Sequence, residues 1–274
     1  MPPDKFRIGE YDCWALADGE LKYPAAVLLP PGERPQEEIA VPYTALLVDN
    51  GSHRILIDTG AESLGPDTGT LLQSLASVGF SAGDIDLVVL SHGHPDHIAG
   101  VPRFPGAEIV MIRKEYEFWT ATETQSRLEV SAIYGLGPLE PLMADYVRRY
   151  LVPAAGRLCL IEHSEKVAPG VLIFPAPGHT PGHAAVLVSS GRQQLLYIGD
   201  TVLLPAQVQN PEWVSAFDLD AEETVRTRKQ LLERAVADRC LVAGFHMPHG
   251  LGVIRNERGR FRWAAEAGLE AVIR

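Results

Sequence analysis

The stretch VVLSHGHPDHIAG, residues 88–100, restricts the possible fold and chemistry more than any other part of the chain. It places three of the nine histidines and one aspartate within six positions, directly after an apolar run. A buried strand ending near Ser91 would expose these side chains together, and Pro95 favours the start of a helix. Imidazole and carboxylate groups are the usual ligands of Zn²⁺, so a metal site explains the stretch better than a polar loop rich in histidine by chance. The expected ligands are His92, His94, Asp96 and His97.

Further candidate ligands follow three later apolar runs. His179 comes after VLIFPA, Asp200 after LLYIG, and His246 after CLVAGF. If these strand ends lie at one edge of the fold, the side chains converge there with the first cluster. Seven ligands suffice for two metal ions, with one bridging carboxylate and one open position for water or substrate.

Two other histidines lie close to predicted ligands. His183 is an alternative to His179 within GHTPGH, and His249 is an alternative to His246 within HMPHG. Either could instead orient a ligand or line the pocket, which is the usual role of extra polar groups near a metal.

The order of apolar segments predicts the fold class. Residues 11–24 read as two strands around a turn at Asp18-Gly19, and Asn50-Gly51 marks a second hairpin. Strands and helices then alternate, with a helix over 221–236 capped by Asp220 and a last helix from Arg262. Two similar halves, each a sheet with helices outside, predict an α/β four-layer αββα sandwich. No linker divides the chain, so we expect a single domain over residues 1–274.

Net charge and composition exclude some classes of binding partner. The chain has 274 residues and a formal net charge of -11, which disfavours nucleic acid and anionic membranes. No segment resembles a signal peptide or a membrane span, and the three cysteines are widely spaced, so we expect a cytoplasmic protein that acts on a small molecule.

Residues 113–156 are expected to form a pocket wall or a homodimer surface. Aromatic walls with few charges suit an apolar acyl chain or an aromatic group, although packing is an equally good explanation of these side chains. This segment supplies Tyr116, Phe118, Trp119, Tyr134, Tyr146 and Tyr150. The segment after Asp200 supplies two more candidates, Trp213 and Phe217.

The motifs HxHxDH, GHTPGH, GD and a late histidine resemble those of the metallo-β-lactamase superfamily, and ILIDTG is similar to its first motif. The resemblance runs from about Thr44 to His246. It implies an αββα sandwich with a dinuclear site, usually zinc, at one edge of the sheets. By this resemblance, one metal would be bound by His92, His94 and His179, and the other by Asp96, His97 and His246. Asp200 would bridge the metals, and Asp58 would be a buried carboxylate that orients the site unless it is only a turn residue.

Departures from the family's branches narrow the function further. Asp200 stands where the best-known β-lactamases have cysteine, and the segment from Asp200 to His246 is too short for the domain of the nucleic-acid-processing branch. No residues remain for the flavin domain of the flavodiiron branch. The tail FDLDAEETVRTRKQLLERA looks most like that of the lactonases and organophosphate hydrolases.

The resemblance implies a dinuclear metal-dependent hydrolase that uses a metal-bridging hydroxide on an ester, lactone or related bond. Two divalent ions would be needed, with zinc expected and iron or manganese as alternatives. Asp96 would also pass a proton to the leaving group. The alternatives are a glyoxalase II-like thioesterase, a mono-iron sulfur dioxygenase, and a non-catalytic binding protein. The complete ligand set argues against the last two.

Overall fold

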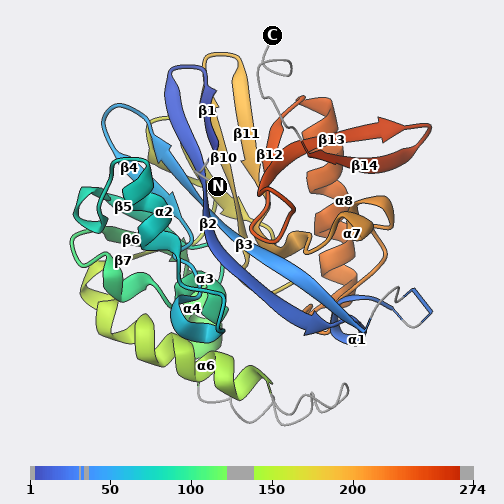
Figure 1. The fold of residues 1–274 in the computed structure, drawn as a ribbon, viewed down its shortest axis with the longest axis horizontal. Helices are drawn as coiled ribbons and strands as arrows, with labels where there is room; N and C mark the ends of the chain where they lie inside the picture. Colours follow the sequence, from blue (N-terminus) through green and yellow to red (C-terminus); the bar gives the residue numbers. More distant parts are fainter. Residues whose placement is uncertain (1–3, 31, 34–36, 122–138, 266–274) are drawn as a thin grey trace.

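Two mixed seven-stranded sheets pack face to face, with helices on both outer faces (Figure 1). The computed structural model describes residues 4–30, 32–33, 37–121 and 139–265. The first sheet contains β1 (Asp4–Ile8), β2 (Tyr11–Pro24), β3 (Glu38–Asp49), β4 (Arg54–Ile57), β5 (Leu87–Val89), β6 (Glu108–Ile112) and β7 (Leu158–Ile161). The second contains β8 (Glu165–Ala168), β9 (Val171–Pro175), β10 (Ala184–Ser190), β11 (Gln193–Tyr197), β12 (Leu241–Ala243), β13 (Leu251–Glu257) and β14 (Arg260–Ala265). The predicted four-layer sandwich is therefore confirmed.

Helices cover each sheet on the side away from the other sheet. The first sheet carries α2 (Leu71–Ser77), α3 (Pro95–Ile98), α4 (Arg113–Thr120) and α6 (Leu139–Tyr150). The second carries α7 (Pro205–Gln209) and α8 (Ala221–Ala237), while α1 (Ala25–Leu28) follows β2. Short 3-10 turns lie at Glu62–Leu64, Ala82–Asp84, Val101–Arg103, Val152–Arg157 and Gly199–Thr201.

Strand direction determines where the loops emerge. β4, β5, β6 and β7 run parallel to one another. In the second sheet, β10 is antiparallel to both β9 and β11, and β12 is parallel to β11. The strands β9, β11 and β12 therefore share one direction. The segments that follow strands of one direction lie at the same edge of their sheet, so the candidate ligands are brought to one edge of the sandwich.

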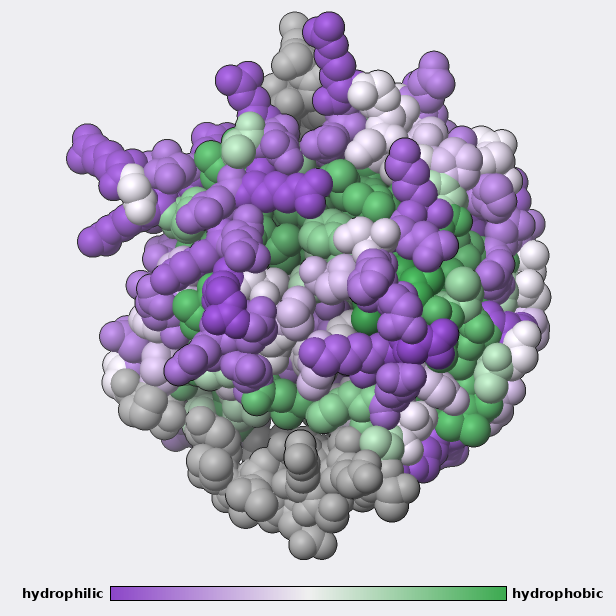
Figure 2. Space-filling model, turned by 180° about the vertical axis from the view of Figure 1, so that it is seen from behind, coloured by the Kyte–Doolittle hydropathy of each residue, from purple (hydrophilic) through white to green (hydrophobic). Residues whose placement is uncertain are grey.

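The central strands are apolar because both of their faces are covered. Every residue of β5 and of β12 is buried. Inward-facing side chains of the two sheets form the main core, and two further clusters lie beneath the helices. Polar and charged side chains cover most of the surface seen in Figure 2, in keeping with the high net charge. Within the described residues, no helix is long and apolar enough to cross a membrane.

One predicted turn is absent: residues 11–24 form a single strand, β2, with an irregularity between Ala17 and Gly19. Asp18 does not lie at the tip of a turn but is buried, and its carboxylate accepts hydrogen bonds from the backbone N–H groups of Ala61 (2.6 Å) and Leu71 (2.8 Å). A β-bulge uses the same residue types as a turn, and only the long-range contacts distinguish the two.

The predicted last helix is wrong over its described part. Residues 260–265 form β14, which pairs with β13 through a two-residue turn at Arg258 (φ 54°) and Gly259 (φ 83°). Positive φ at both turn residues is typical of the tight hairpin turn that matches strand twist. The edge of β13 thus overrides the helical spacing of this segment, and residues 266–274 lie outside the described part of the chain.

Candidate metal centre

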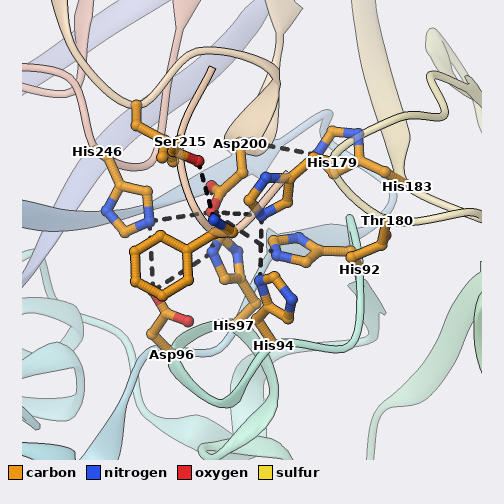
Figure 3. A network of polar contacts seen from close by, with 12 residues as sticks. His92, His94, Asp96, His97, His179, Thr180, His183, Asp200, Ser215 and His246 are labelled. Carbon is orange, nitrogen blue, oxygen red and sulfur yellow. Dashed lines mark hydrogen bonds and ion pairs between the residues drawn. The ribbon is translucent and has the colours of Figure 1, made fainter. Parts of the chain in front are cut away.

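The seven predicted ligands lie together at the edge where β5, β9, β11 and β12 end (Figure 3). They form two groups, and within each group one ligand atom per residue lies within 4.8 Å of the others. The first group is His92, His94, His179 and Asp200, and the second is Asp96, His97, Asp200 and His246. All seven residues are buried, and Asp200 belongs to both groups.

The local chain conformation explains how one short loop serves both groups. His94 is extended (φ -70°, ψ 150°), and α3 begins at the next residue, so Asp96 and His97 lie in its first turn. Gly93 separates His92 from His94, and a Cβ atom there would come within 2.5 Å of the Trp119 ring. The close approach of Trp119 therefore requires glycine between His92 and His94.

The free atoms of the cluster fit divalent metal ions. The Nε2 atoms of His92 and His97 and the Oδ1 atom of Asp200 are buried, and none has a hydrogen-bond partner among the described residues. The Nδ1 atom of His94 and the Nε2 atom of His179 are 3.1 Å apart, a contact between two groups that both carry lone pairs when neutral. One cation in each group would satisfy these atoms. Three nitrogens with one oxygen, or two with two, are typical zinc ligand sets.

The carboxylate of Asp200 lies between the imidazoles of both groups. Its oxygens are 3.2 Å from His97 Nε2, 3.1 Å from His246 Nε2 and 3.4 Å from His179 Nε2. Burial alone would raise the pKa of Asp200, but the neighbouring His246, His97 and His92 hold it well below its usual range. The group therefore remains an anion although its side chain is almost completely buried.

The imidazoles divide into two electrostatic classes. Burial lowers the pKa values of His92 and His94, and the nearby histidines lower them further, so both rings stay neutral and keep a lone pair for a metal. Burial also opposes the charged form of His179 and His246, yet Asp200 and other carboxylates raise the pKa of each to about 9. In the metal-free protein, protons on these rings would balance the charge that the metals are expected to balance.

Asp58 is hydrogen-bonded to the Nδ1 atom of His97, the ring nitrogen that is not expected to bind a metal. Its Oδ2 atom accepts hydrogen bonds from His97 Nδ1–H (2.8 Å), the Tyr197 hydroxyl (2.6 Å) and the Ser91 hydroxyl (2.7 Å). The N–H of Ser91 donates to Oδ1 at 2.8 Å. A carboxylate at Nδ1 of a histidine fixes the tautomer that leaves Nε2 free for a metal. The geometry therefore favours an orienting role for Asp58 over that of a simple turn residue.

His183 uses both ring nitrogens within the protein. Nδ1–H donates to the carbonyl of Ala176 (3.0 Å), and Nε2 accepts the N–H of Asp200 (3.1 Å). No lone pair remains for a metal, so the geometry favours His179 over His183 as the ligand. Burial lowers the pKa of His183 to about 4, which keeps this ring neutral.

His249 occupies a different environment from the other candidate residues. Its side chain is exposed, and its φ of 61° places the backbone in the left-handed region. His246, the alternative ligand, is buried, and its Nδ1 atom is 3.0 Å from the carbonyl of Pro42. The structure therefore gives no support to a role for His249 beside the metals.

The family model described as "Metallo-beta-lactamase superfamily" matches residues 40–243. The chain belongs to the metallo-β-lactamase superfamily. A probable metallo-hydrolase of Mycobacterium tuberculosis is 26% identical over 195 residues, covering 59% of this chain but only 57% of that protein. An N-acyl homoserine lactonase of Bacillus sp. is 24% identical over 229 residues, covering 76% of this chain and 82% of the relative.

Two solved structures resemble this superfamily member along its whole length. The dizinc quorum-quenching lactonase AidC, in complex with a homoserine product, superposes with a TM-score of 0.88, 27% identity and 98% coverage of both chains. The hydrolase AbOPH superposes with a TM-score of 0.89, 23% identity and 98% coverage of both chains, a likeness that concerns the fold.

Two buried carboxylates of this metallo-β-lactamase fold were not predicted from the sequence. Asp218 accepts a hydrogen bond from His179 Nδ1–H (2.9 Å) and lies 3.8 Å from the buried guanidinium of Arg228. Glu115 lies beneath the ligand loops in α4 and is completely buried. The only sequence signal for Glu115 is its spacing of four from Trp119, which places both side chains on one helix face.

A cavity of about 230 Å³ opens onto the two groups. Its metal-side wall contains His94, Asp96, His179, Asp200 and His246, and its apolar wall includes Leu21, Tyr23, Leu28, Val41, Leu64, Met143, Leu203 and Phe217. The expected aromatic wall is thus largely aliphatic. Of the predicted aromatics, Phe217 lines the cavity, Trp119 is buried beside His94, and Tyr134 lies outside the described residues.

Replacing Asp58 with asparagine tests the orientation of His97. An amide offers one acceptor oxygen, and its NH₂ group would face donors that the carboxylate now satisfies. We expect Asp58→Asn to weaken zinc binding by about 10- to 100-fold, as is typical when a group behind a ligand is lost. Competition with a chelator of known affinity measures this change. Asp67→Asn, at an exposed site, is the control, and equal zinc affinity in both variants would contradict the role.

Proposed function

We propose that the protein is a dinuclear metal-dependent hydrolase of lactones that carry an apolar acyl group, with two zinc ions. The observation that carries this proposal is the pair of His/Asp groups that share Asp200 at one wall of an apolar cavity. The similarity to a dizinc lactonase over 98% of the chain supports it. In this proposal, the first metal is held by His92, His94 and His179, the second by Asp96, His97 and His246, and both by Asp200.

Two bound divalent ions would lower the pKa of a water molecule to about 7 and polarise the substrate carbonyl. The protein's own contribution is to hold the ligands in place before substrate binds. Asp58, Asp218 and His183 each hydrogen-bond one ligand residue from the side away from the cavity. This arrangement limits reorganisation during the reaction, which is where preorganised polar sites gain their effect.

The cavity walls favour an apolar substrate. No lysine or arginine is found among the described residues that line the cavity, and the wall opposite the His/Asp groups is mostly aliphatic. Such a wall suits an acyl chain and offers no partner for the carboxylates of a glutathione thioester. The geometry therefore favours a lactone over the glyoxalase II-type substrate, and the complete second group disfavours a mono-iron dioxygenase.

Residues 113–156 contribute to this pocket in the proposal. Met143 of α6 lines the cavity, and α6 contacts both α3 and α4. We propose that this segment, within a single domain, shapes the acyl-binding wall. Its involvement in a homodimer stays a prediction.

Tyr23 is the proposed hydrogen-bond donor to the substrate. Tyr43 is fully buried, and among the described residues its hydroxyl has one hydrogen-bond partner, the hydroxyl of Tyr23. The Tyr43 proton must therefore point to Tyr23, which leaves the Tyr23 O–H free to donate into the cavity that it lines. Burial and the negative charge of Asp96 raise the pKa of Tyr23, so its hydroxyl stays protonated.

Removing this hydroxyl separates substrate recognition from metal binding. We expect Tyr23→Phe to keep two zinc ions and to lower kcat/KM for an acyl lactone by about 10- to 100-fold, because a donor to the developing oxyanion is lost. Steady-state kinetics together with zinc analysis measure both quantities. The control is Tyr11→Phe at the other end of β2, whose hydroxyl bonds to the carbonyl of Pro169. Wild-type kinetics in Tyr23→Phe would refute the assignment.

Asp96 is proposed to act on protons as well as on a metal. It lines the cavity, and its Oδ2 atom is 3.3 Å from His246 Nε2. Burial would raise its pKa, but His97 and His246 lower it overall, so the group is ionised. Its oxygen that faces the cavity would take a proton from the attacking water and pass it to the leaving oxygen.

Substrates with different leaving groups test whether Asp96 transfers a proton. In an Asp96→Asn variant, we expect turnover of an alkyl lactone, whose leaving alkoxide needs a proton, to fall by at least about 10-fold more than that of a nitrophenyl ester. Zinc analysis of the same variant shows whether both metals are retained, and the comparison is made on protein that retains them. An Asp96→Asn protein that keeps both metals and full lactone turnover would contradict the proton transfer.

The central experiment compares substrates with and without metal. Acyl lactones, thioesters, aryl esters and phosphotriesters are assayed with the zinc-loaded protein, after chelation, and after zinc is restored. We expect acyl lactones to have the highest kcat/KM, chelation to abolish turnover, and zinc to restore it. Unchanged activity in metal-stripped protein would refute metal-dependent hydrolysis, and a preference for charged thioesters would refute the lactone assignment.

A further inference from the structure

Glu115 of α4 lies between the two loops that carry the histidines of the first group, and its side chain is completely buried. We infer that Glu115 is a positioning residue that sets the geometry of the first metal group and not of the second. The inference rests on the proposed dinuclear centre, which it extends to a residue that touches neither metal group directly.

One carboxylate oxygen holds the loop after β5. Oε1 of Glu115 accepts hydrogen bonds from the backbone N–H of Gly93 (2.8 Å) and from the indole N–H of Trp119 (2.7 Å). Gly93 lies between His92 and His94, so this contact acts on the backbone that joins two ligands. The Trp119 ring also packs beside that of His94, with 5.6 Å between centroids.

The other oxygen holds the loop between β9 and β10. Oε2 accepts hydrogen bonds from the hydroxyl of Thr180 (2.7 Å) and from the N–H of Gly182 (2.9 Å). Thr180 directly follows His179, the third histidine of the first group. A Cβ atom on Gly182 would lie 2.2 Å from the backbone nitrogen of Glu115, so the loop approaches α4 as closely as glycine allows.

Three of these four contacts join loops from different sheets, since β5 belongs to the first sheet and β9 and β10 belong to the second, while the Trp119 contact lies within α4. One carboxylate thereby sets the distance between His92 and His94 on one loop and His179 on the other. Histidines of the second group have other supports, which are Asp58 for His97 and the carbonyl of Pro42 for His246. Loss of Glu115 should therefore act on one metal and spare the other.

The test variant is Glu115→Gln, which preserves size but not the pattern of acceptors. An amide has one acceptor oxygen, and its NH₂ group would face two N–H or O–H donors, so one loop loses its support. We expect one of the two zinc ions to bind about 10- to 100-fold more weakly, with the other unchanged. Anomalous diffraction at the zinc edge, at limiting zinc, should show reduced occupancy beside His92, His94 and His179 alone.

The matched control is Glu117→Gln on the same helix, where the side chain is exposed and wild-type occupancy of both positions is expected. If Glu115→Gln does not fold, as judged by circular dichroism, Thr180→Val replaces it, because this change removes one donor to Glu115. We expect Thr180→Val to weaken the same zinc ion by a smaller factor.

Equal zinc occupancy of both groups in the folded variant, whether at the wild-type level or equally reduced, would overturn the inference. A wild-type protein that binds no zinc would refute the proposed function itself, so the two failures are distinguishable.

Discussion

The carboxylate of Asp200 holds a negative charge in an almost completely buried position, and the arrangement around it follows from that charge. A buried ion is costly unless it is paired and hydrogen-bonded. Here the imidazoles of His97, His179 and His246 approach it within 3.4 Å, and its own N–H is bonded to His183. Because Asp200 belongs to both His/Asp groups, the position of one side chain couples the geometry of the whole site.

A ring of outer partners keeps the ligands in place. Asp58 holds His97, Asp218 holds His179, the Pro42 carbonyl holds His246, and Glu115 clamps the loops beside the first group. Pro42 is in β3, Asp58 follows β4, Glu115 is in α4, and Asp218 lies between α7 and α8. Residues from several parts of the sandwich therefore stabilise the site. Changes in these outer partners should alter metal binding without removing any ligand.

Much of the fold and of the site was predictable from local patterns. The Asn50-Gly51 hairpin, the helix capped by Asp220 and the apolar central strands were all identified correctly, because each depends on nearby residues. The errors share a cause. The bulge at Ala17–Gly19 and strand β14 depend on pairing with distant strands, and such pairing overrides turn and helix signals. The aliphatic cavity wall likewise depends on which side chains fold back over the site.

By itself, the sequence determined the chemistry: the spacing in SHGHPDH and three residues after later apolar runs are sufficient to identify the candidate ligands and the superfamily. Ligand identity is local, because a strand end and the next helical turn specify it. Tertiary structure alone decided that both ring nitrogens of His183 are used within the protein, which favours His179 as the ligand. It also decided that Glu115 and Asp218 lie behind the ligands and that Tyr23 faces the cavity. These features depend on hydrogen bonds and contacts between segments far apart in the chain, which no local pattern records.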